Sequence, residues 1–501
     1  MENSNIQKQK NDLTEGPILS KLLRFAVPLM AANLVMQLYN IVDTIVIGYA
    51  VGDHGIAAVG ISFPIMMLFN AVFMGVAMGG NIVISQMFGA KNYESLNKAA
   101  NTTAFLAFAL GFGITAIGLL CSRPLLELLN TPAEIIDDAT VYLMIIFGGT
   151  LGNLFFNLSS GILRGLGDSR WPLYAMIFST VLNIALDILF AIILGWGVAG
   201  VAWATLIAHF ISGVILLYRF NTGNYGAKIS LGQILKPDGE ISRHIVRLGT
   251  PSSLQGLAMS LGGLIIMSFA NNFGAAFVTA NSVVQRVDGF AIMPLMGLGM
   301  AATTFSGQNI GANKPERANK GVYVAMGTII TISAVMGVLM WFAGSYIIKL
   351  FNVSDHVLEI GVRGIRWICF FYAFMGIDQC IAGAMRGAGA TVRPLINSFA
   401  AQGSRILFIY LLAVAPLNKA IQAAVDAGRY ATFELAKAAG VGLDGYMGIF
   451  YSMSIGMVLG AILNFLYFKF GNWRSKGIAQ HRQMPSGASQ SDKKPPSPGG
   501  M

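Results

Sequence analysis

The sequence predicts an all-α polytopic membrane protein, with twelve transmembrane helices in two six-helix lobes related by a pseudo-two-fold axis along the membrane normal. Three observations lead to this prediction. Of 501 residues, 55% are hydrophobic and only 11% are charged, whereas soluble domains carry about 25% charged residues. Apolar stretches of about 20 residues, enough to cross a bilayer, recur along the chain. The second half of the sequence also repeats the first at a nearly constant offset.

Each predicted span is an apolar stretch of this length. Six fall in the first half, at roughly 22–47, 56–82, 99–121, 137–161, 172–195 and 197–218. Six follow in the second half, at roughly 245–270, 277–300, 321–343, 357–384, 392–414 and 446–469. An even number of spans places both ends of the chain on one side. Of the 33 Lys and Arg residues, 24 fall on the side of the ends and 7 on the other, so both ends are expected in the cytoplasm.

These spans divide the chain into segments. We expect a cytoplasmic N-terminal segment (1–20), an N-terminal lobe (21–220), a cytoplasmic linker (221–243), a C-terminal lobe (244–470) and a disordered cytoplasmic tail (471–501). Within the second lobe, residues 416–445 mix Ala with spaced charges, which is typical of an amphipathic helix at the outer surface. No small-residue cleavage site precedes the first span, so that helix is expected to remain.

The repeat has an offset of 222 residues. RGLGDSRWP (164–172) returns as RGAGATVRP (386–394), and MGVAMGGNIVISQMFGA (74–90) lies over MGLGMAATTFSGQNIGA (296–312). Such constant spacing indicates a duplication. Six spans in each copy give both halves the same orientation in the membrane.

The first of these phrases falls between the fourth and fifth spans of each half, and it predicts a helix end, a tight turn and a helix start. A cation is favourable at the C-terminal end of a helix, Gly supplies a left-handed turn, and Pro suits the first turn of the next helix. A phosphate-binding glycine loop is disfavoured because no strand precedes it. The residues assigned to the two structural turns are Arg164, Gly165, Gly167, Arg386, Gly387 and Gly389.

Acidic residues within the spans distinguish the two halves. Asp43 and Asp187 align with apolar residues of the second half, and Asn183 aligns with Arg405. Asp43, Asp187 and Thr205 lie about 8 to 12 Å from the outer ends of their helices, and Asn183 shares a helical face with Asp187. A carboxylate in hydrocarbon must pair, protonate or bind a cation, and this half has no Lys or Arg at that depth. We expect proton or cation binding here, the alternative being acids that only line water or neighbouring helices.

The second half also has acids within its predicted spans. Asp378 lies about 12 Å from the cytoplasmic face, and Asp288 could be neutralised by Arg286, two residues away. The candidate substrate or second-lobe site comprises Asp378, Asp288, Gln285 and Arg405.

The remaining features favour a transporter of small molecules. Pro28, in the first span, predicts a kink that serves as a hinge. Met (25 residues) and Phe (32) are plentiful; such residues more often pack helices together, but they also suit a pocket for varied apolar ligands. The 3 Cys and 5 His residues have no disulfide, metal or catalytic spacing, so no cofactor is expected. The sequence has a net charge of +10. The basic residues lie between the apolar spans, which indicates a signal for membrane topology, so no nucleic-acid partner is expected.

These motifs together resemble the multidrug and toxic compound extrusion (MATE) family over roughly residues 15–470. The matching stretches are LTEGPILSKLLRFAVPLM, LYNIVDTIVIG, GAKNYE with its echo GANKPE, RGLGDSRWP, and LNIALDILF followed by GVAGVAWAT. The resemblance implies a cell-membrane antiporter that exports organic cations and other amphipathic drugs in exchange for Na+ or H+, acting as a monomer. In the branch that this sequence resembles more closely, the coupling ion binds at positions matching Asp43, Asn183, Asp187 and Thr205.

The sequence also departs from the family. Another branch has one acid in helix seven and one in helix ten. Helix seven here, LGTPSSLQGLAMSLGGLIIMSFA, has none, which disfavours a coupling site in the C-terminal lobe, although Asp378 in helix ten keeps that alternative open. Residues 416–445 also exceed the loop expected of the family. Two alternatives remain. A lipid-linked precursor flippase of the same wider superfamily would be expected to have a basic central cavity, but only Arg286 and Arg405 lie within spans. A membrane enzyme would need a catalytic constellation. Carboxylates bind both Na+ and H+, so the sequence does not distinguish between the two as the coupling ion.

Overall fold

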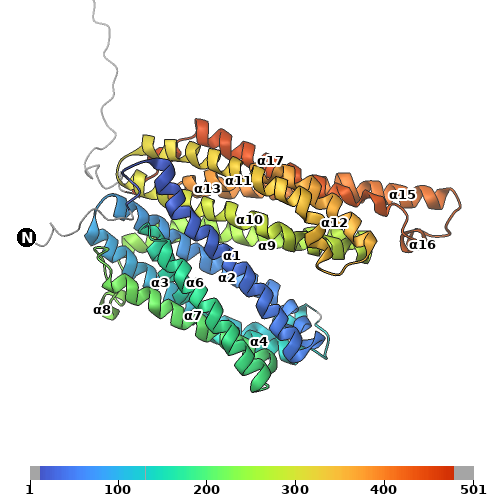
Figure 1. Cartoon of the computed structure of the whole chain (residues 1–501), viewed down its shortest axis with the longest axis horizontal. Coiled ribbons are helices and arrows are strands. Elements are labelled where there is room, and N and C mark those ends of the chain that lie inside the picture. Colours follow the sequence, from blue (N-terminus) through green and yellow to red (C-terminus); the bar gives the residue numbers. More distant parts are fainter. Residues whose placement is uncertain (1–11, 130, 479–501) are drawn as a thin grey trace, which may run out of the picture.

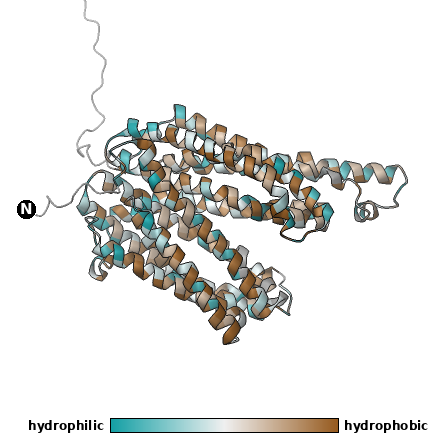
Figure 2. Ribbon diagram, viewed as in Figure 1, coloured by the Kyte–Doolittle hydropathy of each residue, from teal (hydrophilic) through white to brown (hydrophobic). Residues whose placement is uncertain are grey.

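The structure is a computed structural model, and it describes residues 12–129 and 131–478. All regular structure in this part of the chain is helical, and the long helices run side by side (Figure 1). Apolar residues cover the helices along much of their length, whereas hydrophilic residues gather at the end of the bundle where the chain begins (Figure 2). This distribution is that of a bundle whose sides face lipid.

The helices follow the order that the sequence predicts. The first half forms α1 (Ile18–Val51), α2 (Asp53–Gly89), α3 (Tyr93–Leu128), α4 (Ile136–Gly148), α5 (Thr150–Gly165), α6 (Arg170–Asp187) and α7 (Gly197–Thr222). The short α8 (Leu231–Ile234) lies in the linker. The second half forms α9 (Gly239–Ala270), α10 (Gly274–Gly311), α11 (Pro315–Lys349), α12 (Asp355–Ile368), α13 (Tyr372–Gly387), α14 (Val392–Ile409), α15 (Ala415–Asp426), α16 (Phe433–Ala438) and α17 (Met447–Phe470).

Among the described residues, ten helical stretches are long and apolar enough to cross a membrane, and the α4–α5 pair, bent by 47°, provides an eleventh. One of the ten, the 73-residue stretch Gly239–Gly311, contains both α9 and α10. Each of these is longer than the ~20 residues that a span requires. α10 begins at Gly274, whose φ of +81° is a conformation that glycine adopts readily and that allows a turn after α9. Counted as two helices, this stretch completes the twelve predicted spans.

The duplication is visible in the irregular parts of the helices. Gly167 (φ 79°) and Gly389 (φ 93°) both adopt the left-handed conformation just after α5 and α13 end, which confirms the predicted turns. π-helical turns follow α6 at Ile188–Ile193 and α14 at Tyr410–Val414. Their starts are 222 residues apart, so the two halves share local distortions as well as helices.

The two halves meet along α2 with α9 and α1 with α10. Gly75 and Gly249 face each other so closely that a Cβ on Gly249 would overlap the Gly75 carbonyl oxygen. Small residues of this kind let membrane helices approach backbone to backbone. From this contact the two groups of helices diverge toward the end opposite the described chain ends (Figure 1).

A reciprocal pair of hydrogen bonds closes the converging end. Gln86 of α2 donates its Nε2 to the carbonyl oxygen of Gly387 at 2.8 Å, and Gln308 of α10 donates its Nε2 to that of Gly165 at 3.1 Å. We call these four residues the glutamine clasp. Both of its glutamines are 0% exposed, and each binds the helix-ending turn of the other half.

The segments next to the chain ends complete the clasp. The main-chain N–H of Leu13 donates to Gln308 Oε1 at 3.0 Å, and that of Ile478 donates to Gln86 Oε1 at 2.8 Å. Trp473 is 0% exposed, stacks on Phe468 and donates its Nε1 to the Phe468 carbonyl oxygen at 2.9 Å. The sequence-based prediction of disorder from residue 471 was therefore wrong for 471–478, and the rest of that tail lies outside the described residues.

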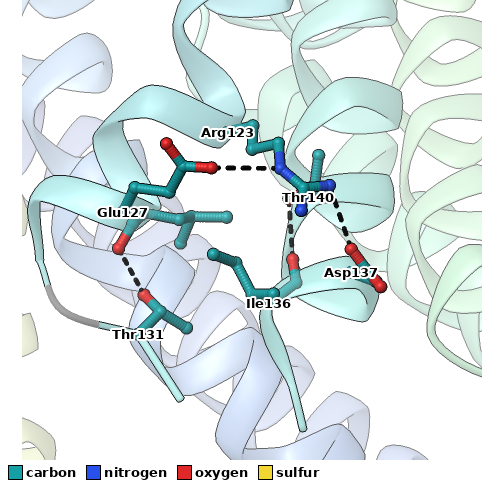
Figure 3. A network of polar contacts seen from close by, with 7 residues as sticks. Arg123, Glu127, Thr131, Ile136, Asp137 and Thr140 are labelled. Carbon is teal, nitrogen blue, oxygen red and sulfur yellow. Dashed lines mark hydrogen bonds and ion pairs between the residues drawn. The ribbon is translucent and has the colours of Figure 1, made fainter. Parts of the chain in front are cut away.

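Toward the end opposite the clasp, exposed polar contacts join α3 to α4 (Figure 3). Arg123 of α3 binds Glu127 through Nε and Asp137 of α4 through Nη1, each at 3.1 Å. Exposed ion pairs contribute only about 0–1 kcal/mol, so this network mainly orients α4 on α3. No ion pair within 4 Å involves an acid buried in the spans of the described chain.

The segment 416–445 differs from the single surface helix that its composition predicts. α15 continues α14 through the π-helical turn and extends beyond the rest of the bundle, with α16 at its far end (Figure 1). Gly428, with φ +70°, follows the end of α15 and breaks the helix. The segment is therefore an extension of the eleventh span followed by a short separate helix.

Candidate functional site

The four residues predicted from the first half lie together where α1, α6 and α7 are in contact. Asp43 comes from α1, Asn183 and Asp187 from one face of α6, and Thr205 from α7. Asn183 and Asp187 are 0% exposed. Asp187 is the last residue of α6 before the π-helical turn. Such turns are frequent at functional sites, and here the helix geometry changes directly next to a buried acid.

Thr205 connects the three helices. Its Oγ1 lies 2.9 Å from the Tyr39 hydroxyl of α1 and accepts a hydrogen bond from Asn183 Nδ2 at 3.4 Å. Four oxygen atoms around it are buried without a hydrogen-bond partner among the described residues. They are Asp43 Oδ1, Asn183 Oδ1 and both carboxylate oxygens of Asp187.

The Asp43 and Asp187 carboxyl groups lie close enough to interact directly. Two ionised carboxylates in contact repel each other, and neither has a Lys or Arg of the described chain within ion-pair distance. The group therefore requires a positive partner, either a proton held between the acids or a metal cation. An oxygen-only set of carboxylates, an amide and a hydroxyl suits a hard cation such as Na+.

Sequence reasoning missed three neighbours of this site. Tyr39 contributes the hydroxyl already described, and Tyr142 of α4 lies within electrostatic reach of both acids. His209 of α7 has a buried Nδ1, and its ring centroid lies 6.0 Å from that of Tyr39. Helical spacing could have found two of them, because Tyr39 precedes Asp43 by four residues and His209 follows Thr205 by four. Within the described chain no three His, Cys, Asp or Glu side chains form a metal-binding group.

In the second half, Asp288 of α10 has different partners from those predicted. It is 6% exposed and accepts a hydrogen bond from the Tyr372 hydroxyl of α13. The cation that interacts with it is Arg405 of α14, whereas Arg286 is exposed. The predicted pairing with Arg286 was wrong, because residues two apart on a helix lie on different faces.

The other second-half candidates do not join this pair. Asp378 of α13 accepts from Asn464 Nδ2 of α17, and Asn464 accepts from Asn397 Nδ2 of α14 at 2.7 Å. Gln285 is exposed on α10. Asp288 and Asp378 thus each have a neutral hydrogen-bond donor, whereas Asp43 Oδ1 and both carboxylate oxygens of Asp187 have none among the described residues.

The turn arginines are placed near the contact between the halves. Arg386 donates its Nη1 to Gln255 Oε1 of α9 at 3.1 Å. Arg164 lines a small pocket together with Met74 of α2 and Met300 of α10. Pro28 lies within a continuous α1, so its role as a hinge stays a prediction.

Comparison with known proteins agrees with this arrangement. The MatE family model matches residues 28–189 and 251–411, one stretch in each half. This chain belongs to the MATE family of membrane transporters. Membership in a transporter family rules out the membrane-enzyme alternative.

Two curated relatives and one solved structure are similar to most of the chain. The probable multidrug resistance protein YpnP of Bacillus subtilis (strain 168) is 29% identical over 464 residues, which is 93% of this chain and 98% of that protein. YoeA of the same strain, also a probable multidrug resistance protein, is 30% identical over 77% of this chain and 85% of its own length. A solved structure described as the outward-facing conformation of a multidrug resistance MATE family transporter has a TM-score of 0.81, with 25% identity over 92% of this chain and 97% of that one.

Proposed function

We propose that this MATE transporter is an antiporter that exports amphipathic, mainly cationic drugs in exchange for Na+ or H+. The names of its relatives as multidrug resistance proteins support the substrate class. The single observation that carries the coupling role is the set of unpartnered buried oxygens of Asp43, Asn183 and Asp187 beside Thr205. These residues form the proposed coupling site.

The coupling site works through charge. A cation or proton that enters from the outer side removes the repulsion between Asp43 and Asp187, which lets α1 and α6 move closer together at that depth. We place the flexing point of α1 at Pro28, where the missing N–H weakens the helix. This movement reshapes the α1 surface that faces the other half and weakens the hold on a bound drug. By reciprocity, the drug must lower the affinity for the ion by the same factor.

The two lobes, residues 21–220 and 244–470, are the bodies that rock against each other in this proposal. Their contacts along α2–α9 and α1–α10 supply the pivot. Asp378, Asp288, Gln285 and Arg405 are assigned to the second lobe, where exposed Gln285 is the candidate for drug contact and the two acids maintain helix packing. Both chain ends are assigned to the cytoplasm, as the Lys and Arg distribution favours.

The test is efflux of ethidium, an organic cation, from proteoliposomes that carry either a Na+ gradient or a pH gradient. Asp187→Asn and Asp43→Asn should each abolish ion-driven efflux, because the repelling pair no longer exists. Asp138→Asn is the matched control, since Asp138 is an exposed acid of α4. It should transport like the parent.

Each outcome has a definite meaning. Efflux driven by one gradient and lost in both variants identifies the ion and supports the coupling site. Normal efflux by Asp187→Asn and Asp43→Asn would contradict it. If folded protein shows no efflux under either gradient, the proposal of a cation-exporting antiporter fails, and an anionic substrate or a lipid-linked precursor flippase becomes the better explanation.

A further inference from the structure

A cationic cavity lies apart from the coupling site, on the face of the bundle that carries both described chain ends. Its volume is about 320 Å³, and it opens between the start of α1, the turn from α5 to α6 and the end of α7. Four basic side chains from three helices line it, namely Lys21, Arg24, Arg170 and Arg219. Such a concentration of positive charge in one cavity needs an explanation.

The protein itself does not neutralise this charge. None of the four cations forms an ion pair within 4 Å with a described acid. Lys21 Nζ donates to a main-chain carbonyl oxygen, that of Asp12, at 2.7 Å. Arg219 Nε is buried without a hydrogen-bond partner among the described residues. The cavity thus keeps cationic donors available for an anion.

The one acid that lines the cavity is already engaged. Asp168 accepts main-chain hydrogen bonds from Arg170 at 3.2 Å and Trp171 at 3.3 Å, and a third from the Tyr225 hydroxyl at 2.6 Å. Burial, together with the negative charge of Asp168, raises the pKa of Tyr225 well above its usual value, so the phenol stays a neutral donor. Asp168 therefore shapes the turn, and the four cations outnumber it.

Aromatic rings fix part of the cationic lining. The Arg219 guanidinium lies over the Trp171 ring at 5.0 Å and over the Tyr225 ring at 5.8 Å, measured to the ring centroids. A guanidinium held in this way is oriented in advance, and its planar fork matches the oxygens of a phosphate.

The surroundings of the cavity indicate what carries the phosphate. Val27 of α1, Tyr174 of α6 and Tyr218 of α7 are 55%, 54% and 71% exposed. These helices are membrane spans, so their exposed apolar faces contact acyl chains. Trp and Tyr beside basic residues are typical of the membrane–water interface, and basic pockets between spans bind anionic lipid head groups.

We propose that this cavity binds the phosphate of an anionic glycerophospholipid whose acyl chains lie along α1, α6 and α7. The lipid head group joins the inner end of α1 to those of α6 and α7.

The experiment uses the full chain reconstituted in phosphatidylcholine, with Trp fluorescence as the readout because Trp171 lines the cavity. Brominated phosphatidylglycerol or brominated phosphatidylcholine is added at the same low mole fraction. The quenching of Trp171 is obtained by subtracting the fluorescence of the Trp171→Phe variant, measured in the same lipids, from that of the parent. The test variant is Arg24→Gln with Arg170→Gln, two exposed residues whose change should leave folding intact. The matched control is Lys91→Gln with Lys320→Gln, also exposed.

We expect brominated phosphatidylglycerol to quench Trp171 several-fold more than brominated phosphatidylcholine. This preference should disappear in the Arg24/Arg170 variant and persist in the control. Equal quenching by the two lipids, or an unchanged preference in the Arg24/Arg170 variant, would overturn the proposal. Loss of the quenching on addition of inorganic phosphate would overturn the lipid assignment and identify a site for a water-soluble phosphate.

Discussion

At the scale of single residues, Thr205 connects the helices of the proposed coupling site although it carries no charge. Its hydroxyl is fixed by Tyr39 from one side and by Asn183 from the other. Both neighbours therefore determine where the Thr205 oxygen lies relative to Asp43 and Asp187.

Tyr39→Phe removes one of these contacts without changing the ring. A neutral hydrogen bond contributes about 0.5–1.5 kcal/mol, so the apparent affinity for the coupling ion should fall roughly 2- to 12-fold. The measurement is ethidium efflux at increasing concentrations of the driving ion. Tyr218→Phe, at an exposed position, should behave like the parent, and identical ion dependence in both variants would mean that Tyr39 plays no part in ion binding.

Sequence reasoning works at this scale where symmetry and helical depth constrain a residue. The contrast between the halves and the equal depth of the side chains suffice to group Asp43, Asn183, Asp187 and Thr205. The same reasoning failed for the partner of Asp288, because Arg405 is distant in the chain and no local pattern connects them. The hydroxyl of Tyr39 was missed because Tyr in a span more often packs than binds.

At the scale of elements, the α2–α10 crossing depends on glycine. A Cβ on Gly311 would overlap the Gln86 carbonyl oxygen, and a Cβ on Gly89 would overlap that of Gln308. The helices cannot move apart without breaking the glutamine clasp, so neither glycine has room for a larger side chain.

Gly311→Ala should therefore destabilise the closed end by about 1–3 kcal/mol, as overpacking does. Thermal unfolding of the purified protein measures this effect, and efflux should fall in parallel because the closed end forms less readily. Gly327→Ala is the control, since a Cβ there meets no atom within 4 Å, and it should match the parent. A Gly311→Ala protein as stable as Gly327→Ala would show that the crossing tolerates a methyl group.

Element ends were predictable where glycine or proline sets them. The turns at Gly167 and Gly389 followed from the repeated phrase, whereas α15 continues past Pro416 because proline is tolerated in the first turn of a helix. The packing of Trp473 could not be foreseen, because its site is formed by Phe468 and only folding creates the hydrogen bond to that carbonyl.

At the scale of the whole molecule, the glutamine clasp joins residues that are 301 and 143 positions apart. Composition and hydropathy carry no information on such pairs, although the duplication makes the second bond an expected consequence of the first. Because the two bonds are related by symmetry, opening this end must break both.

Replacing both clasp glutamines, as Gln86→Leu with Gln308→Leu, should therefore favour the open end more than either change alone. A cysteine at Thr304, which is 1% exposed and lines the small pocket between the halves, reports opening through its reaction with a membrane-impermeant maleimide. The native cysteines are first replaced by serine. Labelling should be fastest in the double variant, and Gln422→Leu, at the far end of α15, should not change it. Equal labelling in the double variant, both single variants and the parent would contradict a gating role for the clasp.

Leu13 and Ile478, next to the two chain ends, hydrogen-bond to the clasp glutamines. They therefore affect the equilibrium between the closed and open states of this end of the molecule. Each of these two residues binds a glutamine of the opposite half, so separating the halves must break both hydrogen bonds or move both residues. An affinity tag or fusion partner placed close to either residue would thus act on the transport cycle as a weak inhibitor or activator. The choice of where to attach a label is, for this transporter, a choice about which conformation is being studied.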